Sequence, residues 1–152
     1  KSKFFLKLQA HFTGEIPLVF IKCEANGHTI DALIDTGAQA TSISADCAKK
    51  CDLHHLIDTR IRGTVIGLQK KQILGRIHLA QIKIENNFFA TSFVVFELSG
   101  IKEGLILGLD FLRTHQCVID FKRGILEIGT TRVKTMLLNK VYSSANKAFK
   151  TL

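Results

Sequence analysis

The residues best suited to chemistry lie in the stretch 32–38, which reads Ala-Leu-Ile-Asp-Thr-Gly-Ala. The apolar residues before Asp35 predict a buried strand that carries one carboxylate to its end. Gly37 permits the sharp turn that leaves this carboxylate facing outward. The same tripeptide is also common in surface turns, where the aspartate caps local amides. The stretch therefore predicts one catalytic carboxylate, Asp35, if the surrounding elements form a cleft.

A zinc site is an alternative, because Cys47, Cys51, His54 and His55 fall within nine positions. Tetrahedral zinc sites usually take their second pair of ligands from a separate segment. We therefore expect core cysteines here, and no metal or cofactor.

The other cysteines and histidines give no stronger signal. No segment around Cys23 or Cys117 is typical of an activated nucleophile, and a chain of this length needs no disulfide framework, so free thiols are expected. His78 and His115 lie on apolar elements, where a structural role is expected.

Composition indicates one globular domain. The chain has 152 residues, of which 46% are hydrophobic, and this is enough for a real core. No apolar run approaches the roughly 20 residues of a membrane span, and no secretion signal opens the chain. A soluble, cytoplasmic or nuclear protein without a membrane partner is expected.

The net charge of +8 raises the question of nucleic acid binding. The basic pairs at 49–50, 70–71 and 122–123 lie in separate segments, and none is interleaved with aromatic residues as in a single-strand binding surface. We therefore expect a solvated basic surface and no nucleic acid partner.

The elements that must position Asp35 have the pattern of β-strands. Residues 1–17 form an N-terminal extension whose alternating apolar residues predict an extra strand. Residues 18–23 and 29–34 flank Asn26-Gly27, the dipeptide that most strongly favours a tight hairpin. A hairpin is thus expected to lead directly into Asp35.

Further along the chain, Ser44 is expected to cap a short helix over 45–51. Residues 60–75 contain three glycines and predict a mobile hairpin rather than a packed strand. Residues 76–84 and 88–96 predict a second hairpin.

The last part of the chain contains a short apolar strand over 105–107, which ends at Gly108. A brief helix over 110–115 and a hairpin formed by 117–121 and 125–128 are expected to follow it. The basic tail from 139 to 152 has apolar residues at helical spacing, and it is expected to be helical or disordered.

These features, in this order, resemble the retroviral-type aspartic proteases, in which a flap covers a cleft and a second glycine turn braces the catalytic loop. Longer blocks resemble the protease domain of the DNA-damage-inducible (Ddi) family of ubiquitin-shuttle proteins. These blocks are residues 26–28, 35–39, 75–81, 107–117 and 128–131.

The resemblance implies a mostly β, retropepsin-like fold over residues 18–138: a closed, barrel-like lobe with a flap hairpin and one or two short helices. It also implies a homodimer in which each chain donates one aspartate to a shared site. The single Asp-Thr-Gly and the short chain agree with this independently.

The activity that the resemblance implies is that of an aspartic endopeptidase acting on extended peptides in ubiquitinated or proteasome-linked proteins. An Asp35 dyad would activate water, without metal or covalent nucleophile.

The resemblance also assigns roles around Asp35. Thr36 would hydrogen-bond across the dyad, and Gly37 would offer its carbonyl to the substrate backbone. The residues implied to bind substrate are Leu33, Ala38, Gln39, Ala40 and Ile106, with Ile66, Gly67, Leu68 and Gln69 at or near the flap tip.

Two departures from the family pattern stand out. Gln69 occupies a position where flaps of this family commonly carry glycine. Leu109 and Gln39 occupy the positions at which viral relatives have an arginine and its acidic partner, so that ion pair is absent.

A structural brace is expected from Thr41, Gly108 and Asp110. If the strand that ends at Gly108 passes behind the catalytic loop, Asp110 should be partly buried and should accept a hydrogen bond from the Thr41 hydroxyl, because a buried carboxylate without partners is costly.

A second function stays open. A catalytically silent dimer of the same fold could serve as a ubiquitin-pathway adaptor that only grips extended peptides by strand addition. The intact Asp35-Thr36-Gly37 favours chemistry over binding alone.

Overall fold

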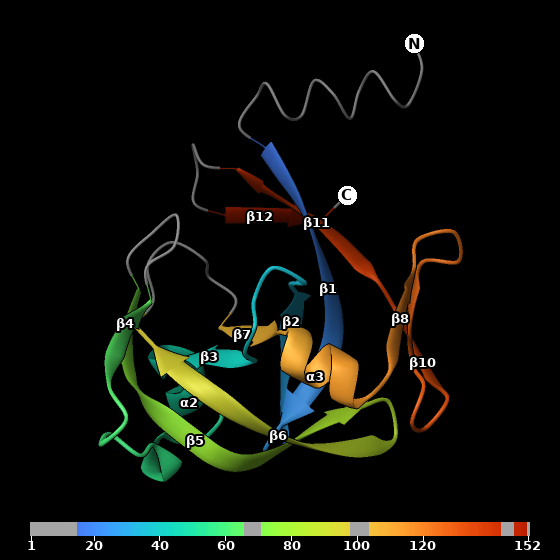
Figure 1. Ribbon diagram of the computed structural model, residues 1–152. Helices are drawn as coiled ribbons and strands as arrows, with labels where there is room; N and C mark the ends of the chain where they lie inside the picture. Colours follow the sequence, from blue (N-terminus) through green and yellow to red (C-terminus); the bar gives the residue numbers. More distant parts are fainter. Residues whose placement is uncertain (1–14, 66–70, 98–103, 144–147, 152) are drawn as a thin grey trace.

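The computed structural model describes residues 15–65, 71–97, 104–143 and 148–151 (Figure 1). In chain order the elements are β1 (Glu15–Ala25), β2 (His28–Ile34), β3 (Ser42–Ser44), α2 (Ala45–Lys50), η1 (His54–Leu56), β4 (Gly63–Val65), β5 (Lys71–Ile84), β6 (Asn87–Phe96), β7 (Leu105–Leu107), α3 (Leu109–Thr114), β8 (Cys117–Asp120), β9 (Ile125–Ile128), β10 (Val133–Met136), β11 (Leu138–Ser143) and β12 (Ala148–Thr151).

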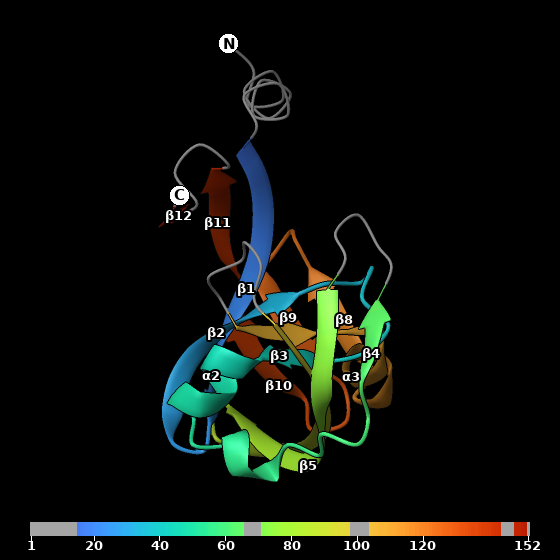
Figure 2. The same ribbon diagram turned by 90° about the vertical axis from the view of Figure 1, so that its left-hand side faces the viewer.

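The larger sheet closes on itself. Within the described ranges its strand order is β12-β11-β1-β2-β7-β3-β6-β5-β4, and an additional pairing joins β1 to β5. The pairing of β1 with β5 closes a barrel, whose strands in sheet order are β1, β2, β7, β3, β6 and β5. Strands β8, β9 and β10 form a separate small sheet beside it (Figures 1 and 2). The predicted mostly β fold with short helices is confirmed.

The predicted hairpin into Asp35 is confirmed. Asn26 and Gly27 connect β1 to β2, and both have positive φ angles, 49° and 78°. Asparagine and glycine tolerate this backbone region better than other residues, so the dipeptide fixes the turn and the register of the two strands. The strand β2 then delivers the chain to Asp35.

The barrel strands carry apolar residues on both faces. On β2, Ala32 and Ile34 belong to the main core, while Leu33 belongs to a second, smaller cluster. On β7, Leu105 and Leu107 face the core and Ile106 faces the second cluster in the same way. Because side chains alternate along a strand, both faces of these two strands are anchored by apolar packing.

The predicted short helices are also present. Ser44 caps α2, with its hydroxyl accepting the Cys47 amide at 3.1 Å. Asp46 in the first turn and Lys49 and Lys50 in the last complement the helix dipole. No helix among the described residues is long and apolar enough to span a bilayer.

The mobile hairpin expected over 60–75 has a different layout. Its arms pair as β4 and β5, from Gly63 with Ile73 to Val65 with Lys71. The second arm does not end at Gly75 but continues as the long strand β5 into the barrel, with a register irregularity near that glycine. Residues 66–70, which include the expected flap tip, lie outside the described part of the chain.

The expectation of a helical or disordered tail is wrong for the described residues. Leu138–Ser143 form β11, which pairs antiparallel with β1, and Ala148–Thr151 form β12, which pairs with β11. Pairing with a preformed strand overrides the weak helical spacing of the tail. The residues 1–14 of the expected N-terminal strand are not among those described.

One ion pair joins β11 to β2, the strand that leads into Asp35. Lys140 Nζ lies 2.6 Å from Asp31 Oδ2 and 5.0 Å from the centroid of the Phe20 ring. The two charged side chains are only 14% and 26% exposed, so this pair is less screened by solvent than a surface pair.

We expect Lys140→Met to destabilise the fold, because it leaves the Asp31 carboxylate without its ammonium partner while keeping an apolar stem over Phe20. A double-mutant cycle with Asp31→Asn, measured by urea denaturation, should give a coupling energy of about 0.5–3 kcal/mol. Additive effects of the two substitutions would contradict a stabilising role for this pair.

Candidate active site

Asp35 is the first residue after β2, and the turn that follows it presents its carboxylate. The Asp35 amide donates to the Leu107 carbonyl at 3.1 Å, which anchors the turn to β7. The Gly37 amide donates to Asp35 Oδ1 at 2.9 Å, and the Ala38 amide donates to the Asp35 carbonyl at 3.2 Å. Asp35 is half-buried, while Thr36 and Gly37 are exposed. The carboxylate is therefore held at the edge of the barrel with the adjacent turn open to solvent.

The loop 35–41 passes over the end of β7. The chain enters the loop from β2, which is parallel to β7, and leaves it through β3, which is antiparallel to β7. Here the loop backbone touches the backbone of Gly108: a Cβ on Gly108 would lie 2.6 Å from the Ala40 carbonyl carbon and 2.9 Å from the Ala38 carbonyl oxygen. Glycine is required at this position by close approach rather than by its φ angle, which is −90°.

Backbone hydrogen bonds join this loop to the start of α3. The Leu109 amide donates to the Ala38 carbonyl at 2.8 Å, and the Asp110 amide donates to the Gln39 carbonyl at 3.1 Å. The substrate-contact residues expected at 38 and 39 are therefore fixed through their main chains.

Thr41 links the loop, β7 and α3 through its side chain. Its hydroxyl accepts the Gly108 amide at 3.1 Å and donates to Asp110 Oδ1 at 2.6 Å. The same carboxylate oxygen also accepts the Thr41 amide at 2.8 Å and the Phe111 amide at 2.7 Å. The predicted hydrogen bond between Thr41 and Asp110 is thus confirmed.

The predicted partial burial of Asp110 holds for one carboxylate oxygen and not for the residue as a whole. Thr41 is 1% exposed, but Asp110 is exposed as a residue, because it lies in the first turn of α3 and turns only one oxygen inward. The inward oxygen accepts three hydrogen bonds, so solvent reaches the other side of the carboxylate without breaking the contact with Thr41.

The structure brings together three of the predicted substrate-binding residues. Leu33 and Ile106 are buried in the second apolar cluster, and Ala38 packs against it. The sequence analysis missed the other members, although the alternation along each strand could have indicated them. They are Phe20 and Phe96, with Leu18 and Leu138 packed at the margin.

The other predicted substrate-binding residues are less closely grouped. Gln39 is exposed and Ala40 is half-buried under Gly108, as the loop path requires. The positions Ile66, Gly67, Leu68 and Gln69 lie outside the described residues.

The cysteines are free thiols within the described part of the chain, as expected, and three of the four are buried. Burial raises the pKa of Cys23 to about 12 and that of Cys117 to about 11. A hydrogen bond from Cys47 lowers the pKa of Cys51, but Cys51 is 0% exposed. A cysteine nucleophile is not supported, since the thiol with the lowered pKa has no open surface.

The two histidines expected to have structural roles, His78 and His115, lie in different surroundings. His115 packs between Phe111 and Phe89, with ring centroids 4.5 and 5.1 Å away, and burial lowers its pKa. Its expected structural role is confirmed. His78 is instead 57% exposed and contacts Asp58.

Comparisons with known proteins agree with this geometry. A model of the family described as "Aspartyl protease" matches residues 11–120. The chain is 44% identical over 125 residues to the Protein DDI1 homolog 1 of Bos taurus and 43% identical over the same length to that of Homo sapiens. These alignments cover 82% of this chain, which spans only 31% of the length of each relative. The crystal structure of the retroviral protease-like domain of Ddi1 from Leishmania major has a TM-score of 0.71 at 31% identity, covering 81% of this chain and 95% of that one.

Removal of the Thr41 hydroxyl tests the hydrogen-bond network behind the loop. We expect Thr41→Val to cost about 1–3 kcal/mol of stability, because it leaves the Gly108 amide without an acceptor and removes one donor to Asp110. Thr41→Ser, which keeps the hydroxyl, should retain most of the stability in chemical denaturation. Equal stability of the valine and wild-type proteins would refute the role given to this hydroxyl.

The backbone contact at Gly108 gives a second test. We expect Gly108→Ala to destabilise the fold by about 1–3 kcal/mol, because the loop must move to admit a methyl group. Gly63→Ala is the matched control, since the nearest atom to its Cβ is the end of the Ile73 side chain at 3.9 Å. Thermal unfolding that shifts equally for both variants would argue against tight packing at Gly108.

Proposed function

The chain belongs to the retropepsin-like aspartyl proteases of the Ddi family, and we propose that it hydrolyses peptide bonds with a water molecule activated by the Asp35 carboxylates of two copies. The observation that carries the proposal is the half-buried Asp35 on an exposed turn, held against β7 and α3 by the crossing at Gly108. A catalytic group needs this combination of fixed backbone and open carboxylate.

The proposal needs two copies because one chain supplies only one Asp-Thr-Gly loop. The chain contains one Asp-Thr-Gly sequence, and the described residues form one barrel with one such loop. Two carboxylates a few ångströms apart cannot both ionise readily, so they share one proton and titrate as a pair. A single copy supplies only half of this arrangement.

The shared proton defines the chemistry. The ionised member of the pair takes a proton from water as the water attacks the peptide carbonyl, and the protonated member donates its proton to the carbonyl oxygen. As the C–N bond breaks, the proton taken from water passes to the leaving amine, and one hydroxyl proton of the intermediate returns to the pair. In this proposal the Thr36 hydroxyl bonds across the pair and the Gly37 carbonyl accepts from the substrate backbone. The exposure of both residues supports these roles.

The substrate class in this proposal is an extended peptide with apolar side chains near the scissile bond. The second apolar cluster supports this, because Leu33, Ala38 and Ile106 lie beside the catalytic turn. The β4–β5 hairpin would cover such a peptide, and membership of the Ddi family suggests ubiquitinated or proteasome-linked proteins as its source.

The test is hydrolysis of a diverse peptide library over acidic to neutral pH by the wild-type protein and by Asp35→Asn. Asparagine keeps the size and the hydrogen bond from Gly37 but cannot share a proton, so we expect cleavage to be lost at every pH while the thermal unfolding curve stays close to that of the wild type.

Two results would count against the proposal. Cleavage by Asp35→Asn at the wild-type rate would exclude Asp35 as the catalytic group. Peptide binding by the wild type without any cleavage would favour the silent adaptor.

The need for two copies gives a separate prediction. Specific activity should fall on dilution as the dimer dissociates, and light scattering on the same samples can follow this dissociation.

A further inference from the structure

Asp58 occupies the point at which the chain enters the β4–β5 hairpin. Its amide donates to the Arg76 carbonyl at 2.8 Å, and the Arg76 amide donates to the Asp58 carbonyl at 3.1 Å. At the neighbouring Gly75, a Cβ would lie 2.6 Å from the Asp58 carbonyl oxygen. The two chain segments therefore touch, backbone against backbone, at the base of the hairpin.

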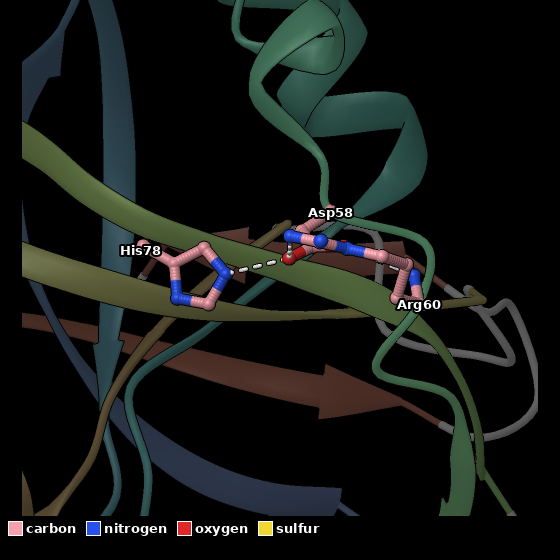
Figure 3. A network of polar contacts seen from close by, with 3 residues as sticks. All are labelled: Asp58, Arg60 and His78. Carbon is pink, nitrogen blue, oxygen red and sulfur yellow. Dashed lines mark hydrogen bonds and ion pairs between the residues drawn. The ribbon is translucent and has the colours of Figure 1, made fainter.

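The Asp58 carboxylate forms contacts with side chains from both of these segments, Arg60 and His78 (Figure 3). Its Oδ1 accepts the Arg60 amide at 3.0 Å and Arg60 Nε at 2.9 Å, while its Oδ2 accepts Arg60 Nη2 at 2.8 Å. From β5, His78 Nε2 lies 2.9 Å from the same Oδ2. One carboxylate thus connects the segment that leads into β4 with the strand β5.

Other nearby cations have partners elsewhere. Arg76 Nη2 donates to the Ser92 hydroxyl at 2.9 Å, and Arg62 Nε donates to the Thr59 carbonyl at 2.8 Å.

The hydrogen bonds from Arg60 and His78 hold the pKa of Asp58 well below its usual range. Because the pKa of Asp58 is lower in the folded protein than in the unfolded chain, its ionised carboxylate stabilises the fold at every pH above the ordinary carboxylate pKa. This stabilisation is lost only as the pH falls through the lower pKa of the folded protein. The contact therefore persists in the mildly acidic range in which a shared-proton dyad works.

The exposure of the partners indicates what this contact does. The Asp58 side chain is 13% exposed, but those of Arg60 and His78 are 88% and 57% exposed. Exposed ion pairs contribute little to global stability. Their donors can nevertheless fix the local direction of a chain segment, because a bidentate arginine and an imidazole leave the carboxylate little freedom. In both views β4 runs towards the end of the barrel at which loop 35–41 lies (Figures 1 and 2).

We propose that Asp58 is a positioning residue that sets the direction of the β4–β5 hairpin relative to the barrel, with His78 as its partner on β5. The inference rests on the proposed function only in that the hairpin covers the bound peptide. Asp58 touches no reacting atom, so it acts on substrate capture rather than on the proton transfers.

The experiment compares Asp58→Asn with a matched control, Asp120→Asn. Asp120 makes the same kind of contact in the β8–β9 turn, where it accepts the Arg123 amide at 2.8 Å and Arg123 Nε at 2.6 Å, but this contact does not involve the hairpin. Hydrogen exchange is measured in the Asp35→Asn background, so that the readout does not depend on activity. We expect Asp58→Asn to speed exchange about tenfold in residues 60–65 and 71–77 and to leave the rest of the barrel unchanged, because only the base of the hairpin loses a contact.

Kinetics on the protein with Asp35 intact separate positioning from catalysis. Asp58→Asn should raise KM several-fold with a smaller change in kcat, since ordering of the hairpin is an added cost of peptide binding. His78→Gln, which keeps an N–H donor, should behave more like the wild type than His78→Leu. Asp120→Asn should match the wild type in both measurements.

Three outcomes would overturn the inference: unchanged exchange in 60–65 and 71–77, faster exchange spread evenly over the barrel, or the same effect from Asp120→Asn. Its failure is distinguishable from failure of the proposed function. If Asp35→Asn still cleaves peptides, the catalytic assignment falls, but the exchange result for Asp58 stands by itself.

Discussion

The structure depends on one steric constraint, the passage of loop 35–41 across Gly108. The backbones approach so closely that a methyl group on Gly108 would lie 2.6 Å from the Ala40 carbonyl carbon. Strands β2 and β3, on either side of the loop, both pair with β7, so the loop cannot slide without breaking the barrel. The position of the Asp35 carboxylate depends on this crossing, because the Asp35 amide donates to the carbonyl of Leu107, the last residue of β7.

Two regions around the site are held by different interactions. Behind the loop, the buried Thr41 hydroxyl joins the Gly108 amide to Asp110, and loss of such a contact leaves a buried polar group unsatisfied. At the base of the β4–β5 hairpin, the Asp58 carboxylate contacts the exposed side chains of Arg60 and His78, which water can replace at small cost. The candidate site therefore combines a firmly held loop, 35–41, with a hairpin whose attachment is easier to alter. Enzymes that close over a substrate use such a combination.

Local sequence signals predicted the parts of the fold that local physics determines. Asn26-Gly27 specified a turn that needs positive φ, and Ser44 specified a helix cap. The tail could not be predicted in this way, because its strand conformation comes from pairing with β1, more than 100 residues earlier in the chain. The Asp58 contact was missed for the same reason: His78 lies 20 positions away, and only the β5 path brings it close.

The presentation of the Asp35 carboxylate was predictable from the sequence, but its surroundings were not. An aspartate after an apolar strand, followed by threonine and glycine, already indicates a presented carboxylate. The Thr41–Asp110 contact followed from the expected path of the β7 strand behind the loop and from the cost of a carboxylate without partners. Which apolar residues pack with Leu33 of β2 depends on strand order, which brings Phe20, Phe96 and Ile106 to it from β1, β6 and β7. Such a face is built by four strands at once. Its shape, and under the proposed function any preference among peptides, is therefore a property of the barrel rather than of the Asp-Thr-Gly tripeptide.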